Sequence, residues 1–355
     1  MARSSNNPWF HRFAFALAMV TLALVCVGGL VTSHEAGMAV PDWPNTFGYN
    51  MFFFPISKWV GGIFYEHTHR LLASAVGFLT IILAVWLWIK EDRKWLRWFG
   101  VAALAAVILQ GILGGLRVTW MKDELGIFHA ALAQLFFALI CAIALFSSRW
   151  WIEGPASVGQ GISFSGMRKL AAAGTLLILA QLILGATMRH QHAGLAIPDF
   201  PAAYGRIWPA TDADSVARYN QLRTEVTALN PITSFQIILQ MAHRLGALAI
   251  MVITGWVAWF GLKRFGAKTL VRRLSLGWFF VVLGQAALGA ATIWTNKSAD
   301  IATAHVALGA LALANGALLI LVSSRCSWKT PALETRRSAG VKECMTDPTP
   351  VEVPA

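Results

Sequence analysis

Long hydrophobic blocks separated by short polar segments run through most of this 355-residue chain. Each block has about twenty residues or more, enough for a helix to cross a hydrocarbon layer of roughly 30 Å. An isolated strand cannot satisfy its backbone hydrogen bonds in lipid, so each block is predicted to be a helix. The predicted spans are 10–32, 60–89, 98–119, 125–147, 168–188, 233–261, 272–294 and 301–323.

Composition agrees with this pattern. Hydrophobic residues make up 57% of the chain and charged residues 13%, whereas soluble domains have about 45–50% and about 25%. A soluble enzyme is therefore excluded, and the lipid bilayer is the expected environment. The net charge of +12 is spread over short loops, as topology-setting charge is, so no nucleic-acid partner is expected.

The distribution of Lys and Arg predicts the orientation. With the N-terminus in the cytoplasm, the cytoplasmic segments carry 19 of the 29 basic residues and the outer segments carry eight. An excess of basic residues marks cytoplasmic loops, so both termini are expected in the cytoplasm. The four cysteines form no C-x-x-C pair, and no thiol redox pair or covalently attached heme is predicted.

An internal repeat divides the chain into two halves. The pattern Ala-Gly-x-Ala-x-Pro-Asp-aromatic-Pro occurs at 36–44 and again at 193–201. Each half holds four spans and enters the membrane in the same direction. We therefore expect an all-α polytopic protein of two side-by-side four-helix bundles, related by a pseudo-two-fold axis along the membrane normal. The predicted units are a first repeat (1–147), a cytoplasmic linker (148–167), a second repeat (168–324) and a disordered polar cytoplasmic tail (325–355).

The second outer loop is longer than the first. The extra residues include 212–229, whose apolar positions predict a short amphipathic helix at the membrane interface.

Four histidines occupy matching positions within the spans. Ionisable groups are costly inside a membrane and usually have a partner or a function. Each half has one such histidine in its second span and one in its fourth span, both in the predicted outer half of the bilayer. Two imidazoles that face each other across a bundle are the arrangement needed for axial ligation of heme iron. Two heme sites are predicted, with the ligands His69 and His129 in the first half and His243 and His305 in the second.

The two halves differ beside these histidines. Glu66 lies one helical turn before His69, whereas Gln240 occupies the matching place before His243. A carboxylate can hold or take a proton and an amide cannot, so the first half is the candidate catalytic half and the second a candidate electron-transfer site. A purely structural hydrogen bond from Glu66 is the alternative. Arg70 and Arg244 could pair with heme propionates, or they could snorkel and satisfy helix carbonyls.

Four further histidines are not expected to ligate heme iron, although those at the outer edge could cover a heme edge or bind a metal. His67 points to another face of its span and is expected to be structural, and three others lie at the outer edge, where solvated loop positions are expected: His34, His190 and His192.

Taken together, these motifs resemble the heme A synthase family, found in bacterial membranes and in the mitochondrial inner membrane. The resemblance rests on the two loop motifs, the eight-span plan and the residues Glu66-His67-Thr68-His69-Arg70, His129, His243-Arg244 and His305. It implies an oxidoreductase acting on a CH group, which hydroxylates the C8 methyl of heme O twice to give the formyl group of heme A for terminal oxidases.

The resemblance also implies roles for the residues. Glu66 matches the catalytic carboxylate, His69 and His129 match the ligands of the substrate heme O, and His243 and His305 match the ligands of a permanent heme b. Some bacterial members carry a cysteine pair in an outer loop, and this chain has no cysteine in its predicted outer loops. The expected location is the bacterial inner membrane, with both termini in the cytoplasm.

The implied partners are heme O synthase and components of terminal oxidase assembly. A separate electron acceptor or donor is also expected, because no dinucleotide-binding glycine motif is present. A homo-oligomer is compatible with the sequence.

Two other functions fit part of the pattern. A di-heme cytochrome b of the quinol type would explain four histidines, although it gives no reason for the difference between Glu66 and Gln240. A transporter would explain a duplicated bundle, but transporters usually bind substrate between the repeats, whereas these polar groups are predicted inside each bundle.

Overall fold

Eight long helices form nearly all of the structure, a computed structural model that describes residues 8–122, 124–154, 164–222 and 231–327. All eight are long and apolar enough to cross a membrane, which confirms the predicted all-α polytopic fold. The helices are α1 (Pro8–Ser33), α2 (Gly61–Lys90), α3 (Lys94–Trp120), α4 (Glu124–Phe146), α6 (Ser165–His190), α8 (Ser234–Arg264), α9 (Leu270–Trp294) and α10 (Ala299–Ser327).

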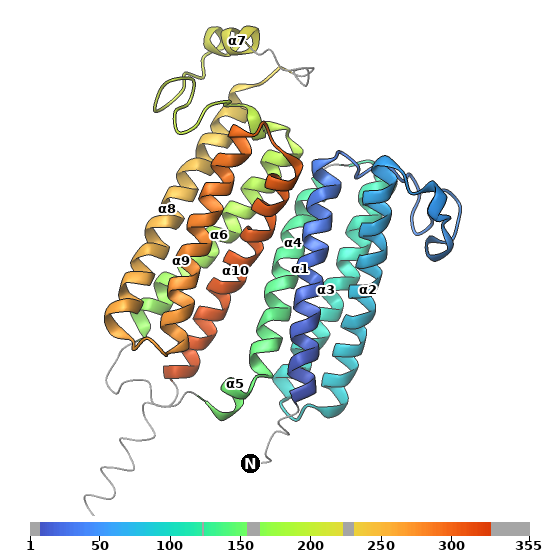
Figure 1. Cartoon of the computed structure of the whole chain (residues 1–355), viewed down its shortest axis with the longest axis vertical. Helices are drawn as coiled ribbons and strands as arrows, with labels where there is room; N and C mark the ends of the chain where they lie inside the picture. Colours follow the sequence, from blue (N-terminus) through green and yellow to red (C-terminus); the bar gives the residue numbers. More distant parts are fainter. Residues whose placement is uncertain (1–7, 123, 155–163, 223–230, 328–355) are drawn as a thin grey trace, which may run out of the picture.

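The long helices form two bundles that stand side by side (Figure 1). In the first bundle, α1 packs on α2, α2 on α3, α3 on α4, and α4 back on α1. In the second bundle, α6, α8, α9 and α10 close a ring in the same way. The bundles meet through α1 against α10, α4 against α6, and α4 against α10. These neighbours are the ones that the predicted two-fold axis requires, since that axis exchanges α1 with α6 and α4 with α10.

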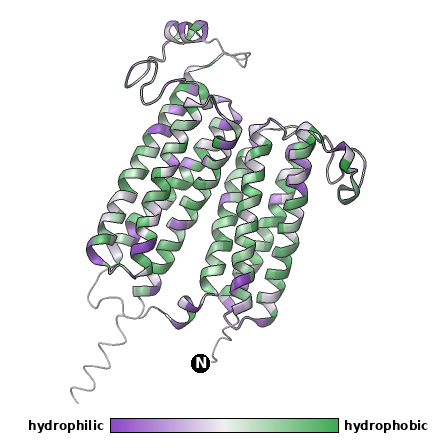
Figure 2. Ribbon diagram, in the orientation of Figure 1, coloured by the Kyte–Doolittle hydropathy of each residue, from purple (hydrophilic) through white to green (hydrophobic). Residues whose placement is uncertain are grey.

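Apolar side chains cover the outside of the bundles as well as the inside. Figure 2 shows hydrophobic residues around most of each long helix, with hydrophilic ones gathered toward the helix ends. Large side chains such as Phe78, Trp88, Val252 and Phe280 are more than half exposed in the isolated chain. Such a surface is stable where lipid replaces water.

The two longest connections between the long helices lie at the same end of the bundles (Figure 1). Residues 34–60 join α1 to α2 and include the short 3-10 helices η1 (Met51–Phe53) and η2 (Ile56–Lys58). Residues 191–233 join α6 to α8 and contain η3 (Ala193–Leu195) and α7 (Ala213–Leu222). Helix α7 is amphipathic, as predicted, and lies beyond the end of α8 (Figure 1). Residues 223–229 of the predicted segment fall outside the described residues.

Two predicted boundaries differ from the structure. A short helix, α5 (Arg149–Glu153), begins the predicted linker, where the Ser148 side chain accepts a hydrogen bond from Trp151 N. Helix α10 extends to Ser327, so 325–327 belong to the last helix rather than to the polar tail. The rest of the predicted tail, 328–355, lies outside the described residues.

Helix packing in the second bundle depends on a small residue beside a large one. Trp278 is fully buried, and its Nε1 donates to Ala312 O at 2.8 Å. A Cβ added to Gly174 would lie 2.8 Å from Trp278 Cη2, too close for any real contact. Glycine at this position therefore leaves room for the Trp278 ring, which reaches from α9 across the bundle to α6.

We expect Gly174→Leu to destabilise the protein by about 1–3 kcal/mol, the usual cost of overpacking a filled core. The measurement is thermal unfolding in detergent, followed by loss of the monodisperse peak in size-exclusion chromatography. Gly77→Leu is the matched control, because a Cβ at Gly77 meets no atom within 4 Å. Equal stability of the two variants would contradict this account of the packing.

Candidate heme sites

The four predicted heme ligands lie near the same ends of their helices. His69 is in α2, His129 in α4, His243 in α8 and His305 in α10. These helices all begin at the end of the molecule that carries the long connections (Figure 1). Each bundle therefore holds one pair of histidines at one end, in the arrangement that the sequence predicts.

Each of these histidine rings packs against a glycine of a neighbouring helix. A Cβ added to Gly28 of α1 would lie 3.0 Å from His69 Cε1, and one added to Gly114 of α3 would lie 3.3 Å from His129 Cε1. The second bundle repeats this arrangement, with distances of 3.2 Å from Gly185 to His243 Cε1 and 3.1 Å from Gly289 to His305 Cε1. These glycines therefore make room for the histidine rings.

The pair in the second bundle has the geometry of two facing ligands. The ring centroids of His243 and His305 are 6.4 Å apart. His305 Nδ1 lies 3.1 Å from Gln285 O, and a carbonyl oxygen only accepts, so Nδ1 carries the hydrogen. Nε2 is then left with its lone pair, and Gln285 Nε2 lies 3.4 Å from it. A backbone carbonyl that fixes the tautomer in this way is typical of histidines that bind metals.

Further buried polar atoms favour a ligand at these sites. The Nδ1 atoms of His69, His129 and His243 are buried and have no hydrogen-bond partner among the described residues. A buried polar group without a partner costs free energy. No cluster of three or more metal-ligating side chains occurs in the described part of the chain. Heme iron takes four nitrogens from the porphyrin and needs only two from the protein, so a histidine pair in each bundle fits heme.

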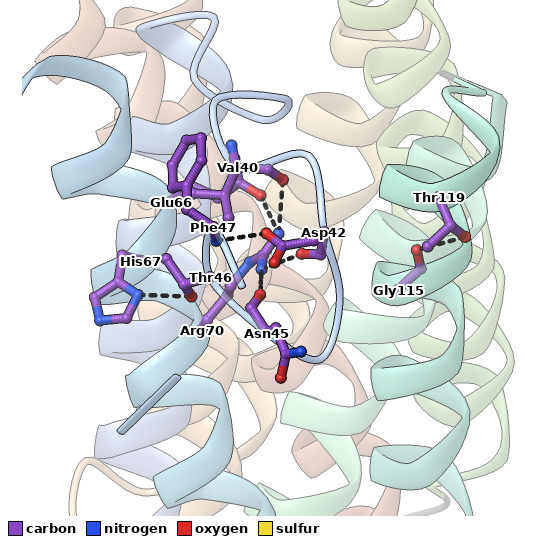
Figure 3. Close-up of polar contacts among 10 residues, drawn as sticks. All are labelled: Val40, Asp42, Asn45, Thr46, Phe47, Glu66, His67, Arg70, Gly115 and Thr119. Carbon is purple, nitrogen blue, oxygen red and sulfur yellow. Dashed lines mark hydrogen bonds and ion pairs between the residues drawn. The ribbon is translucent and has the colours of Figure 1, made fainter. Parts of the chain in front are cut away.

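Arg70 organises the loop between α1 and α2, the predicted first outer loop (Figure 3). Its Nη1 donates to Asp42 O at 2.7 Å and Asn45 O at 2.9 Å, and its Nη2 donates to Val40 O at 3.0 Å. Nη2 also forms an ion pair with Glu66 Oε1 at 2.7 Å. Arg70 is thus bound to carbonyls of the loop rather than to helix carbonyls, and its predicted contact with a heme propionate stays a prediction.

Glu66 is buried and directed at the same loop. Its Oε2 accepts a hydrogen bond from Val40 N at 2.9 Å, while Oε1 is bound to Arg70. The structural alternative considered for Glu66 therefore has a geometric basis. A carboxylate has about four lone-pair sites, so these two contacts leave acceptor capacity for a proton.

The second outer loop is held by matching contacts. Gln240 Oε1 accepts from Ile197 N at 2.7 Å, as Glu66 does from Val40 N. Arg244 donates to Ala202 O at 2.8 Å and to Asp199 O at 2.6 Å. A neutral amide therefore suffices to hold a loop of this shape, which separates the structural role of position 66 from the charge that Glu66 adds.

An aspartate in each loop closes the turn that follows the Pro-Asp-aromatic-Pro segment. Asp42 accepts from Phe47 N and Gly48 N, both at 2.8 Å, and Asp199 accepts from Tyr204 N at 2.7 Å and Gly205 N at 2.8 Å. Partial burial disfavours the charge of Asp42, but these amide donors and Arg70 outweigh it, so the pKa of Asp42 lies below its ordinary value.

The aromatic residue of each loop covers its bundle differently. In the first bundle, Trp43 lies directly on α3, where a Cβ at Gly115 would be 2.6 Å from Trp43 Cδ2. In the second bundle, Phe200 packs edge-on against Trp294 of α9 at 6.0 Å, and Trp294 Nε1 donates to Phe200 O at 3.2 Å. Both segments therefore lie over the ends of the bundles that hold the histidines.

The other histidines lie apart from the facing pairs. His67 is fully buried and packs against Phe54 and Trp59. Its Nδ1 atom lies 3.2 Å from Thr46 Oγ1. His34 stacks on Tyr65 at a centroid distance of 4.0 Å.

His190 and His192 lie at the end of α6, and His190 belongs to the helix rather than to a solvated loop. His190 ends α6 and packs against Gly126 of α4 at the junction of the bundles, and His192 follows α6 in the left-handed backbone region.

Sequence reasoning missed one polar residue that supports a ligand helix. Gln181 of α6 donates to His243 O at 2.6 Å, much as Gln110 of α3 donates to His129 O at 3.1 Å. Gln110 matches Gln285 in the repeat, whereas Gln181 has Leu24 at its matching place. The available signal was a glutamine inside a hydrophobic span.

Comparison with known proteins adds to this geometry. Residues 11–316 match the family described as cytochrome oxidase assembly protein, COX15-CtaA. A heme A synthase of Lysinibacillus sphaericus (strain C3-41) is 22% identical over 329 residues, covering 91% of this chain and 98% of the relative. A heme A synthase of Chelativorans sp. (strain BNC1) is 26% identical over 363 residues, covering 92% of both chains.

A third relative, the heme A synthase of Geobacillus kaustophilus (strain HTA426), is 25% identical over 308 residues, covering 82% of this chain and 84% of the relative. The family match includes all four facing histidines and both outer loops. This chain therefore belongs to the heme A synthase family of cytochrome oxidase assembly proteins.

Proposed function

We propose that this protein is a heme A synthase, an oxidoreductase that converts the C8 methyl of heme O into the formyl group of heme A by two successive hydroxylations. The names of the relatives support this assignment. The observation that carries it is the presence of one histidine pair in each bundle, with a carboxylate beside the first pair and an amide beside the second. A di-heme cytochrome b would need no such difference.

The two bundles take different roles in this proposal. His69 and His129 bind the iron of the substrate, heme O, whereas His243 and His305 bind a permanent heme b. Heme b, when bound, supplies one-electron redox chemistry. The farnesyl tail of heme O is strongly apolar, so a first bundle surrounded by lipid accommodates it without exposing it to water.

Glu66 is the proposed catalytic carboxylate. Its oxygens are held by Val40 N and Arg70, so its position is fixed beside the first histidine pair. In the proposed reaction Glu66 accepts a proton as the methyl carbon is oxidised, or stabilises positive charge that develops there. Conversion of a methyl to a formyl group removes four electrons, which a separate acceptor must take.

The proposed location is the bacterial inner membrane, with both termini in the cytoplasm and the heme sites in the outer half of the bilayer. The excess of basic residues in the predicted cytoplasmic segments supports this orientation. Heme O synthase and terminal oxidase assembly components are the proposed partners, since they make the substrate and use the product.

The heme content of the protein tests the function directly. The chain is expressed with a heme O-producing enzyme in a host that lacks heme A, and extracted hemes are separated by chromatography and mass spectrometry. We expect heme A, or its hydroxymethyl precursor, together with heme B. Heme B alone, from folded protein in membranes that contain heme O and the redox partner, would favour the di-heme cytochrome b.

Glu66→Gln separates the charge of Glu66 from its contacts with the loop. Gln240 shows that an amide accepts the backbone hydrogen bond at the matching position, so this variant should fold and keep heme b. We expect heme A formation to fall at least about 100-fold, the lower end of the contribution of a general acid or base. The measurement is heme A formed per heme b in purified protein.

Gln240→Glu is the matched control for this variant. It adds a carboxylate to the second bundle and should leave heme A formation within about twofold of wild type, because the reacting methyl lies in the first bundle under this proposal. Wild-type activity of Glu66→Gln would contradict the catalytic role and leave Glu66 with its structural role alone.

Alanine substitutions of the histidines test which heme each pair binds. His243→Ala and His305→Ala should each lose most of the tightly bound heme b, because one axial ligand is removed. His69→Ala and His129→Ala should keep heme b and lose heme A formation. Absorption spectra and heme extraction of the purified variants provide the measurement. A full complement of heme b in His243→Ala would refute the assignment of the second site.

A further inference from the structure

A basic side chain of the second bundle reaches across to the first bundle near the heme sites. Arg189, in the last turn of α6, donates through Nη2 to Gly29 O of α1 at 2.9 Å and also to Ser33 Oγ. Ser33 Oγ in turn lies 3.5 Å from Thr303 Oγ1 of α10. The Nε atom of Arg189 is buried and has no hydrogen-bond partner among the described residues. The guanidinium therefore keeps an unused donor at the junction of the bundles.

A second cation lies close to this guanidinium. Lys297, between α9 and α10, is partly buried and interacts electrostatically with Arg189 and with Glu35. Burial and the nearby Arg189 lower the pKa of Lys297, while Glu35 acts in the opposite direction. Two like charges that are held together in a partly desolvated place repel each other, and a bound anion would remove that repulsion.

The position of this pair relates it to the second heme site. Arg189 donates to Ser33 Oγ, which lies 3.5 Å from Thr303 Oγ1, two residues before His305 in α10, and Lys297 lies two residues before that helix begins. Arg70 and Arg244, the cations next to the histidines in sequence, already donate to loop carbonyls. Arg189 thus differs from Arg70 and Arg244, because its hydrogen bonds go to α1 and no loop carbonyl among the described residues takes up the N–H donor at its Nε atom.

The first bundle lacks half of this arrangement. In the repeat, the place of Arg189 is taken by Thr32, whereas the place of Lys297 is taken by Lys122. The cation near the first histidine pair is instead Arg117, in the last turn of α3, so the two bundles place their cations on different helices.

We propose that Arg189 and Lys297 form a carboxylate-binding site that receives a propionate of the heme held by His243 and His305. This inference rests on the proposed heme site of the second bundle. Arginine binds carboxylates through paired N–H donors, and the contact of Arg189 with Gly29 O fixes the guanidinium against α1. The site therefore retains heme b and places one of its propionates at the junction with the first bundle.

Arg189→Gln in the purified holoprotein tests the proposal. Loss of one charge-assisted hydrogen bond corresponds to about a tenfold faster loss of heme b, measured by transfer to apomyoglobin. The midpoint potential of the remaining heme b should also fall in a spectroelectrochemical titration. Ferric heme carries one more positive charge than ferrous heme, so a nearby cation favours the reduced form. Lys297→Gln should cause smaller changes in the same directions.

Two further variants keep the test decisive. Arg206→Gln removes an exposed cation from the second outer loop and should change neither quantity. Arg189→Lys keeps the charge, so its midpoint potential should lie closer to wild type than that of Arg189→Gln. If Arg189 only joined the bundles, Arg189→Gln would lose heme faster without any change in the potential of the heme that remains, and the proposal would be wrong.

The remaining outcomes separate this inference from the proposed function. Unchanged heme retention and potential in Arg189→Gln, with less copurifying phospholipid by phosphorus analysis, would assign the pair to a lipid headgroup and overturn the propionate site. Unchanged values with unchanged phospholipid would overturn it as well. A wild-type protein that binds no heme through His243 and His305 would instead overturn the proposed function.

Discussion

In each bundle, an arginine that donates to loop carbonyls determines the form of the end that carries the long loop. A loop that folds back over a helix bundle carries backbone carbonyls away from water, and each needs a donor. Arg70 supplies donors to three of them and also pairs with Glu66, and Arg244 supplies two in the second bundle. Removal of one member of such a buried pair typically costs about 3–5 kcal/mol. The placement of the loops over the histidines therefore depends on these guanidinium groups.

The same contacts explain why the difference between Glu66 and Gln240 is informative. Both side chains accept a hydrogen bond from a loop amide, Val40 N in one case and Ile197 N in the other. Gln240 also places its Nε2 3.2 Å from Ile197 O, so this position holds the loop without a carboxylate of its own. The architecture thus requires an acceptor at this position but not a charge. A buried charge that the fold does not require is costly, so its presence in one half only is an argument for chemistry in that half.

The sequence was sufficient to predict the spans, the four histidines and the difference between Glu66 and Gln240. Hydropathy and residue spacing can be read from short stretches of sequence, and alignment of the two halves reveals where they differ. The targets of Arg70 could not be predicted in the same way, because Val40, Asp42 and Asn45 meet Arg70 only after the loop has folded back. Arg189 was counted among outer basic residues, and its contact with Gly29 depends on the packing of two bundles that no periodicity specifies.

The packing of the two loop aromatics shows how one architecture can serve two roles. In the first bundle the large ring is Trp43 of the loop, which lies on Gly115 of α3, and the helix position that matches Trp294 is Thr119, one turn further along (Figure 3). In the second bundle the loop has Phe200 and the helix has the large ring, Trp294. The second arrangement adds a hydrogen bond from Trp294 Nε1 to Phe200 O, so loop and helix are joined by more than ring contact. A substrate that enters and leaves as product requires a covering segment that separates from its helix at low cost, whereas a permanent heme benefits from one that stays in place. The distribution of aromatic and small residues is therefore the one that the proposed function requires, with exchange in the first bundle and retention in the second.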